Sequence, residues 1–311
     1  MPDILSIGEI LIDLIGQEMA DGLARTDAFE RHPGGSPANM ARTAALAGAD
    51  VAMIGCVGAD GFGDLLREEL RAVGVDTQYI QTPPSSSGGG TTPTTVVLLS
   101  RTLGTPDFVV FRQADAQLAV PVVPQDVLST TRIAHTTSFA LSLEPARTAI
   151  LSTLEQAADH GAQISIDANY MPDIGPDRDT GQALIRQVCA LDALVKVSLD
   201  DVERIFGRAM DPDAAVQTLH DWGARLVCLT RGKDGSRVSW EGGGRAEDVP
   251  VALVEPTGDA TGAGDAFWGG FLTAHLRDLT PPACAARGAA VAARKLETTG
   301  PLSEPFDLEH L

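Results

Sequence analysis

The most informative segment of this 311-residue chain is Asp259-Ala260-Thr261-Gly262-Ala263-Gly264-Asp265-Ala266-Phe267. Its glycines allow the backbone to turn sharply and to approach a ligand closely. The small and apolar residues that follow predict a buried helix over residues 265–276. The N–H groups of residues 262–265 would then lie at a helix N-terminus, where unpaired amides and the helix dipole bind anions.

Asp265 is the candidate catalytic residue of this segment. A carboxylate at this position can accept a proton from a hydroxyl while the amides of Gly262, Ala263 and Gly264 hold negative charge on a phosphate. The segment alone leaves a second interpretation open, in which it is a glycine turn and Asp265 merely caps the helix.

Short apolar runs alternate with helical patterns along most of the chain. Runs rich in Val, Ile and Leu between helices predict a mostly parallel sheet covered on both faces, which is a three-layer α/β/α fold. Strands are predicted at residues 4–8, 51–57, 133–137, 164–167, 193–197 and 226–230. Helices are predicted at residues 36–46, 62–73, 145–160, 180–190, 199–206, 213–222, 265–276 and 281–296.

Two regions interrupt this alternation, at residues 11–33 and 92–112. The second resembles a hairpin of strands 94–99 and 107–111. Strands outside the main pattern can form a small sheet over the carboxyl ends of the parallel strands, where ligands bind in open α/β sheets. We therefore expect a single domain over residues 1–311, with a small β-sheet lid formed by about 11–33 and 92–112.

The charge balance limits the classes of partner. Lys and Arg number 23 and Asp and Glu 42, a net charge of −19, which disfavours nucleic acids and anionic membranes. A polyanion such as ATP remains compatible if local amides, a few basic side chains and a divalent cation bind it.

The chain also indicates a compartment. It lacks a long apolar run and a basic start before an apolar segment, so neither a membrane span nor a signal peptide is predicted. The expected location is cytoplasmic, with reduced and buried thiols at Cys56, Cys189, Cys228 and Cys284.

Common nucleotide-binding motifs are missing. Gly232-Lys233 is followed by Asp234, so the chain has no P-loop, and no dinucleotide fingerprint follows the first strand. Residues 262–265 therefore remain the strong candidate for phosphate binding.

A second glycine segment lies near the N-terminus, at Pro33-Gly34-Gly35-Ser36-Pro37-Ala38-Asn39. The two glycines permit a close approach, Ser36 can cap a helix and Pro37 suits its first position. The amide of Asn39 both donates and accepts hydrogen bonds, so it can bind a polyhydroxyl ligand. An ordinary helix start is the alternative interpretation of this segment.

In combination the two glycine segments resemble the PfkB family of carbohydrate kinases, typified by ribokinase and fructokinase. The resemblance covers nearly the whole chain. Gly34, Gly35 and Asn39 match the N-terminal motif, which continues through residues 55–63 and 74–77. Residues 259–267 match the C-terminal motif, with Ala260 where Thr is common.

The resemblance implies a ribokinase-like fold and ATP-dependent phosphorylation of a hydroxyl, expected to be primary, on a neutral monosaccharide. Fructose is the first candidate. It assigns the sugar to Asp13, Gly34, Gly35, Asn39, Arg112 and Asn169. Met171 replaces the arginine with which members of the family that use acidic sugars bind a carboxylate, and this argues against a sugar acid.

For the nucleotide, the resemblance implies ATP with Mg²⁺. It places Thr230, Gly232 and Gly235 against the phosphates and ribose, and Ser198 where the family has Asn in an Asn-x-x-Glu motif. Asp201 stands at the Glu position and retains an oxygen ligand for a metal. The resemblance also suggests a monovalent cation, usually potassium, behind the anion hole near Asp259 and Thr261.

Several alternatives remain at this level. A nucleoside kinase or a 2-keto-3-deoxygluconate kinase would have the same fold, although residues 111–112 with Asp167 and Asn169 favour the fructokinase type. A catalytically silent sugar-sensing protein is disfavoured by the intact Asp265, and an oxidoreductase by the missing fingerprint. The expected partners are a sugar and ATP, without nucleic acid or membrane, and a homodimer through the lid is one option for the assembly.

Overall fold

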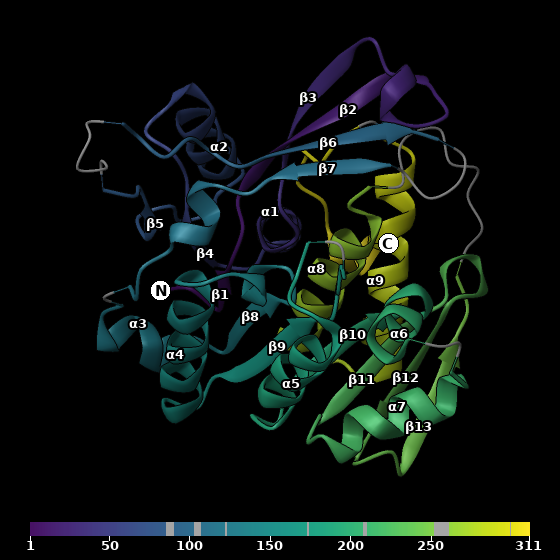
Figure 1. Cartoon of the computed structure of the whole chain (residues 1–311). Coiled ribbons are helices and arrows are strands. Elements are labelled where there is room, and N and C mark those ends of the chain that lie inside the picture. Colours follow the sequence, from purple (N-terminus) through teal and green to yellow (C-terminus); the bar gives the residue numbers. More distant parts are fainter. Residues whose placement is uncertain are drawn as a thin grey trace.

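A nine-stranded sheet occupies the centre of the described part of the molecule, in the order β13-β12-β11-β10-β9-β8-β1-β4-β5 (Figure 1). The computed structural model describes residues 1–84, 90–102, 107–121, 123–172, 174–207, 210–251, 261–298 and 300–311. The strands are β1 (Ile4–Ile7), β4 (Val51–Cys56), β5 (Ile80–Gln81), β8 (Ile133–Thr137), β9 (Gln163–Asp167), β10 (Leu194–Ser198), β11 (Leu226–Thr230), β12 (Ser236–Trp240) and β13 (Arg245–Val249). Neighbours from β11 to β5 are parallel, whereas β12 and β13 pair antiparallel.

Helices cover both faces of this sheet, so its inner strands are apolar and buried along their length. One face packs against α1 (Ser36–Leu46), α2 (Gly61–Ala72), α8 (Ala263–Leu276) and α9 (Pro281–Leu296). The other packs against α3 (Gln125–Thr130), α4 (Ala146–Asp159), α5 (Arg178–Cys189), α6 (Leu199–Phe206) and α7 (Pro212–Asp221). The predicted three-layer fold with a mostly parallel sheet is confirmed.

The predicted bounds differ from the observed ones chiefly at edges. Helices α1, α6 and α9 have the predicted bounds, and α8 begins two residues earlier than predicted, at Ala263. The short helix α3 and the hairpin of β12 and β13 were not predicted. Most of β13 is exposed at the edge of the sheet and carries Arg, Glu and Asp, so it has no apolar alternation that sequence analysis could detect.

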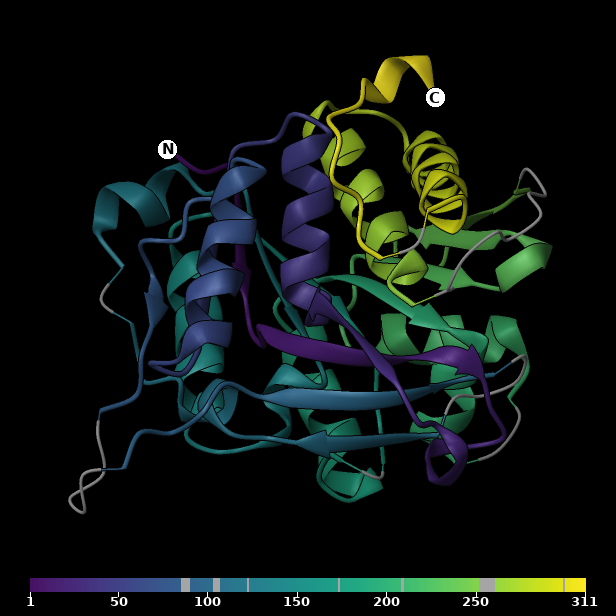
Figure 2. The same ribbon diagram turned by 90° about the horizontal axis from the view of Figure 1, so that it is seen from above.

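A second sheet of four strands lies over the carboxyl ends of the parallel strands (Figures 1 and 2). Its strands, in the order β3-β2-β6-β7, are β2 (Leu11–Met19), β3 (Phe29–Gly34), β6 (Val96–Arg101) and β7 (Phe108–Phe111). Strand β2 pairs parallel with β6, so the two irregular regions of the sequence form one sheet. The predicted smaller second sheet is therefore confirmed, and we call it the lid.

Two further expectations concern the chain as a whole. The four cysteines are buried and form no disulfide, as predicted. Within the described ranges, no helix is both long enough and apolar enough to cross a lipid bilayer.

Candidate active site

A cleft of about 380 Å³ separates the lid from the carboxyl ends of the central strands. This volume lies in the range of small-molecule sites. The cleft is lined by ten of the residues predicted for the site, namely Asp13, Gly35, Asn39, Asn169, Ser198, Asp201, Thr261, Gly262, Gly264 and Asp265. Residues far apart in the sequence therefore meet in one place.

The N-terminus of α8 lies at the floor of this cleft. Gly262 precedes the helix with a φ of 79°, in the left-handed region that glycine adopts without strain. The first helical hydrogen bond runs from the N–H of Ala266 to the carbonyl of Gly262, at 2.9 Å. The N–H groups of residues 263–265 therefore have no acceptor within the helix, as an anion hole requires.

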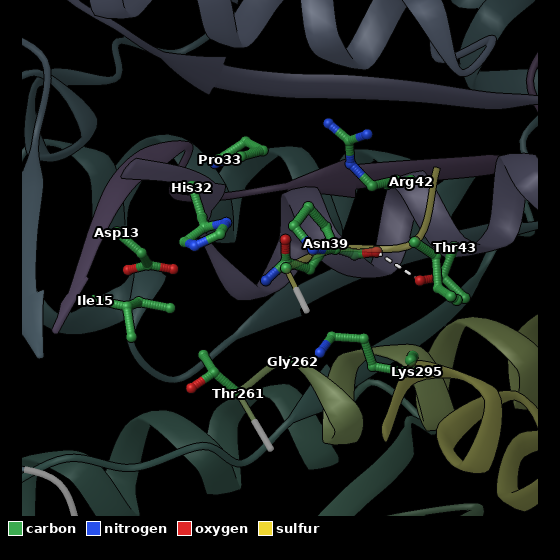
Figure 3. Close-up of a pocket in the computed structure, with 14 residues that line it drawn as sticks. Asp13, Ile15, His32, Pro33, Asn39, Arg42, Thr43, Thr261, Gly262 and Lys295 are labelled. Carbon is green, nitrogen blue, oxygen red and sulfur yellow. Dashed lines mark hydrogen bonds between the residues drawn. The ribbon is translucent and has the colours of Figure 1, made fainter. Parts of the chain in front are cut away.

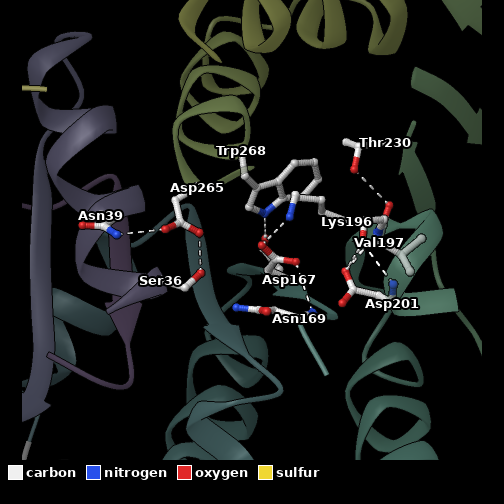
Figure 4. Close-up of polar contacts among 12 residues, drawn as sticks. Ser36, Asn39, Asp167, Asn169, Lys196, Val197, Asp201, Thr230, Asp265 and Trp268 are labelled. Atoms are coloured by element: carbon white, nitrogen blue, oxygen red, sulfur yellow. Dashed lines mark hydrogen bonds and ion pairs between the residues drawn. The ribbon is translucent and has the colours of Figure 1, made fainter. Parts of the chain in front are cut away.

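Asp265, in the first turn of α8, is held by two donors from α1 (Figure 4). The Ser36 hydroxyl donates to Oδ1 at 2.6 Å and the Asn39 amide donates to Oδ2 at 2.9 Å. Each oxygen keeps a further lone pair for a substrate proton. Burial raises the pKa of Asp265, with a smaller rise from Asp167, and outweighs the lowering by Ser36, Asn39 and Lys196.

The two glycines before α1 make room for other groups of the site. A Cβ on Gly34 would collide with the Asp13 carboxylate, and one on Gly35 would collide with the backbone of Glu9. Gly35 also has a φ of 99°. The glycine pair therefore lets β2 and β3 pack closely enough to bring Asp13 into the cleft.

A buried ion pair that sequence analysis missed lines the same cleft as Asp265. Lys196 Nζ is 2.6 Å from Asp167 Oδ2, and the two residues are register partners on adjacent strands β10 and β9. Burial alone would lower the pKa of Lys196, but the carboxylates of Asp167, Asp201 and Asp265 outweigh it, and the pKa is raised. The ammonium would lie 3.2 Å from a Cβ on Gly264, so a charged group stands beside the anion hole. The detectable signal was a lysine inside an apolar strand, which is rarely buried without a partner.

Ser198 and Asp201 form the capping box of α6. Asp201 Oδ2 accepts from the Ser198 hydroxyl at 2.6 Å and from its N–H at 3.1 Å, and Oδ1 lies 3.5 Å from Arg204. Burial raises the pKa of Asp201, against an opposing effect of Lys196. Among the described residues no cluster of three or more His, Cys, Asp or Glu can hold a metal ion. A metal role for Asp201 therefore stays a prediction.

The other predicted nucleotide and cation residues lie near this end of the sheet or outside the described ranges. The Thr230 hydroxyl donates to the carbonyl of Val197 at 3.4 Å (Figure 4). Gly232 and Gly235 both have positive φ, at 57° and 82°, and bracket a tight turn after β11. Asp259 lies outside the described residues.

Arg112 is engaged with protein groups. Its Nη2 is 2.6 Å from Asp115 Oδ2, its Nη1 donates to the Ser142 hydroxyl at 2.7 Å, and its guanidinium stacks over Phe139 at 4.2 Å. Phe139 lines the cleft, whereas Arg112 is not among the lining residues. The predicted contact of Arg112 with sugar has no support in these contacts and stays a prediction.

Glu9 is a second residue that sequence analysis did not select. It follows β1, lines the cleft and is buried. Its carboxyl oxygens accept from the Ser36 N–H at 3.1 Å and the Thr137 hydroxyl at 3.2 Å. Burial raises the pKa of Glu9 to about 8. An acidic residue directly after a buried strand was the available signal.

Comparisons with known proteins agree on a family. The sequence profile described as "pfkB family carbohydrate kinase" matches residues 1–306. The ATP-dependent 6-phosphofructokinase of Thermoanaerobacterium thermosaccharolyticum is 30% identical over 307 residues, which cover 99% of this chain and 92% of that protein.

Solved structures give the same result. The fructokinase of Halothermothrix orenii is 30% identical with a TM-score of 0.79, over 93% of this chain and 96% of that one. A sugar kinase of Pyrococcus horikoshii, solved in complex with ATP, is 28% identical with a TM-score of 0.83, over 99% and 96% of the two chains.

Proposed function

This chain belongs to the pfkB family of carbohydrate kinases and is a sugar kinase, and we propose that it transfers the γ-phosphoryl group of ATP to a hydroxyl, a primary one, of a neutral monosaccharide. Fructose is the first candidate, supported by the similarity to a protein named as a fructokinase. The observation that carries the proposal is the position of Asp265, at the helix N-terminus on the cleft floor, with both oxygens held by neutral donors.

Asp265 acts as the general base. The sugar oxygen attacks the γ-phosphorus, the bond to the ADP oxygen breaks, and the hydroxyl proton passes to the carboxylate. The amides of residues 262–265 stabilise the negative charge on the transferred group. A raised pKa supports this assignment, because a base is most effective when its pKa lies near the working pH.

Lys196 stabilises the same charge from the other side. Its ammonium stands beside Gly264 and stays protonated through its pairing with Asp167. The site thus combines a fixed cation with the helix N-terminus, and phosphoryl transfer depends chiefly on such electrostatic stabilisation.

ATP and magnesium would bind at the end of the cleft near α6, where Ser198 and Asp201 line it. Thr230, Gly232 and Gly235 contact the nucleotide, and Ser198 and Asp201 lie beside its phosphates. When bound, magnesium would supply positive charge that offsets the negative charge of the phosphates during transfer. Asp201 is the carboxylate that would hold this ion.

The charge of the cleft supports a neutral sugar. Its described lining includes five carboxyl residues, Glu9, Asp13, Asp167, Asp201 and Asp265. The two basic lining residues, Lys196 and Arg204, are each paired with one of these carboxylates. A sugar acid or a sugar phosphate would bring further negative charge, and Met171 supplies no cation for it. Asp13 and Asn169 are assigned to the hydroxyls.

The lid closes over the sugar. Its inner face contributes Asp13, Val97, Leu99, Phe108 and Val110 to the cleft, so closure would exclude water from the γ-phosphate. Hydrogen exchange in β2 and β6 should slow on adding sugar while exchange in β9 changes little. Equal exchange with and without sugar would contradict closure.

The outer face of the lid supports a homodimer. Val109 and Phe111 are 44% and 55% exposed on β7, and large exposed apolar side chains are typical of interaction sites. Phe111→Glu should shift the mass measured by light scattering from dimer to monomer. A monomeric wild-type protein would exclude this assembly.

A coupled assay of ADP release tests the function. ATP and magnesium are combined with fructose, glucose, ribose, fructose 6-phosphate, 2-keto-3-deoxygluconate or adenosine, with Asp265→Asn as the inactive control. We expect fructose to have the highest kcat/KM. A higher value for fructose 6-phosphate, the sugar acid or adenosine would overturn the neutral-sugar assignment, and no turnover with any substrate would favour a sugar-sensing protein.

A further inference from the structure

A small, partly open cavity of about 30 Å³ adjoins the anion hole and shares Asp13, Asn39, Thr261 and Gly262 with the sugar cleft (Figure 3). Its lining includes Thr261 and Gly262, Asn39 and Arg42 of α1, and Lys295 of α9. Its volume accommodates one or two water molecules or a bare ion. The family resemblance suggests a potassium ion near Asp259 and Thr261. Asp259 lies outside the described residues, whereas Thr261 borders this cavity.

Oxygen-bearing residues border this cavity, namely Asp13, Asn39, Thr43 and Thr261, but the buried Lys295 already brings a cation to the same cavity. Potassium is bound by oxygen atoms that replace its water shell. Here the Lys295 side chain is 3% exposed and extends from the last turn of α9 toward Gly262 and Asn39 (Figure 3). Its Cε would lie 3.8 Å from a Cβ on Gly262. Arg42, a second basic residue of the lining, is paired with Glu69 at 3.2 Å. A further cation in the cavity would be repelled by the Lys295 ammonium.

The positions of the lysines in this chain also support a lysine cation beside the anion hole. Only three of the 23 basic residues are lysines, at positions 196, 233 and 295. Two of these three are buried, and each lies beside a glycine of the anion hole, Lys196 by Gly264 and Lys295 by Gly262. Lysine presents a compact point charge, whereas arginine presents a wide planar group. Lys196 and Lys295 thus lie where a cation must fit into a confined space.

We propose that the ammonium group of Lys295 takes the place of the monovalent cation behind the anion hole and makes the enzyme independent of potassium. The inference rests on the proposed phosphoryl transfer at Asp265. Lys295 does not line the sugar cleft, so it is a positioning residue: it adds positive charge behind Gly262 and holds the backbone of the anion hole in place.

The ion dependence of the enzyme and of two variants tests this proposal. Wild-type kcat is measured in potassium chloride and in choline chloride at equal ionic strength, and the two values should agree. Lys295→Ala removes the ammonium and leaves room for an ion. Its kcat in choline should fall on the order of tenfold to a hundredfold, with potassium or methylammonium restoring part of the loss and the sugar KM changing little.

Lys295→Met separates the effect of the charge from the effect of filling the cavity, because its side chain fills the cavity without carrying a charge. Its kcat should be low in both salts. Arg294→Met is the matched control: it removes a charge from the same turn of α9, but Arg294 stacks over Phe306 and does not line the cavity. It should behave as the wild type.

Thermal unfolding and calorimetric ADP binding provide readouts that do not need turnover. Potassium should raise the Tm and the ADP affinity of Lys295→Ala but not those of the wild type. A wild-type protein whose kcat, Tm or ADP affinity depends on potassium would overturn the proposal, as would two active Lys295 variants. If neither variant folds, the comparison of wild-type kcat in potassium chloride and in choline chloride decides. If no sugar is phosphorylated, the proposed function fails, while the binding and unfolding data still test Lys295.

Discussion

Two aspartates, the half-buried Asp265 and the buried Asp167, line the same cleft and have different partners (Figure 4). Asp265 accepts hydrogen bonds from two neutral groups, the Ser36 hydroxyl and the Asn39 amide. Asp167 is paired with the ammonium of Lys196 at 2.6 Å. Both residues are aspartates that line one cleft, so the partners determine what each carboxylate can do.

Neutral donors orient a carboxylate but do not neutralise its charge. The carboxylate can therefore still take up a proton as a base. A buried ammonium holds the carboxylate in an ion pair. Removing either member of the pair is costly, because it leaves an uncompensated charge in the interior. The comparison therefore predicts that variants of Asp265 affect rate and that variants of Asp167 and Lys196 affect both rate and stability.

The largest effect is expected for Asp265→Asn. Its kcat should fall by roughly two to four orders of magnitude, the usual contribution of a positioned base. The Tm and the Kd for ADP should change little, because Asn has the same size. Asp167→Asn is the paired variant and should lower the Tm as well as kcat. A nearly unchanged kcat in Asp265→Asn would remove this residue from the mechanism.

Next in size is Lys196→Met, which should lower kcat about 10²–10³-fold by removing a fixed cation beside the transferred phosphoryl group. It should also lower the free energy of unfolding, since Asp167 loses its partner. The double variant Asp167→Asn/Lys196→Met should regain stability, measured by urea unfolding, but not rate. Recovery of both would mean that Lys196 is purely structural.

A smaller effect distinguishes Asp13 from Asn39. Asp13→Ala should raise the sugar KM far more than the ATP KM, because Asp13 lines the cleft from the lid. Asn39→Ala should raise the sugar KM and also lower kcat, since its amide holds Asp265. Steady-state kinetics with both substrates varied separates the two cases. Identical kinetic profiles for the two variants would contradict the different roles.

The smallest effect is expected for Glu9, and it concerns the pH dependence of the free energy of unfolding. Its pKa is about 8 in the folded chain, raised by burial from 4.5, so the folded state binds the proton more tightly than the unfolded state. The stability from this group is fully present below pH 4.5 and is lost as pH rises through 8.

Glu9→Gln cannot ionise and keeps the acceptor for the Ser36 N–H. The variant should therefore match the wild type in free energy of unfolding at about pH 5 and exceed it by a few kcal/mol at most at about pH 9. Urea unfolding at both pH values measures the difference. A variant that is less stable than the wild type at alkaline pH would show that Glu9 is stabilised as a carboxylate.

Much of the framework could be predicted because it depends on short-range patterns. The buried runs of β1, β4 and β8 and the periodicity of α1 identify their own secondary structure. The irregular regions around β2 and β6 were predicted as one lid because they stand outside that pattern. By contrast, β13 carries exposed polar residues and is defined only by its pairing with β12.

The residues of the site also fall into those that the sequence could predict and those that it could not. Residues 262–265 and 34–39 were found because close backbone approaches require glycine, and this requirement is visible in the sequence. Lys196 and Glu9 were missed because each is a single charged residue whose role depends on a neighbour on another strand or helix. Asn39 was assigned to the sugar from its chemistry, and only the packing of α1 against α8 brings its amide to Asp265.

The sequence by itself determined the layered fold, the family and the segment that forms the anion hole, because local periodicity and glycine spacing encode them. Only the tertiary structure decided the partners of each charge. Ser36 meets Asp265 across 229 residues of chain, and Lys196 meets Asp167 across 29. Such contacts depend on how helices and strands pack, and a carboxylate of the cleft becomes a base or half of an ion pair according to the group that packing places beside it.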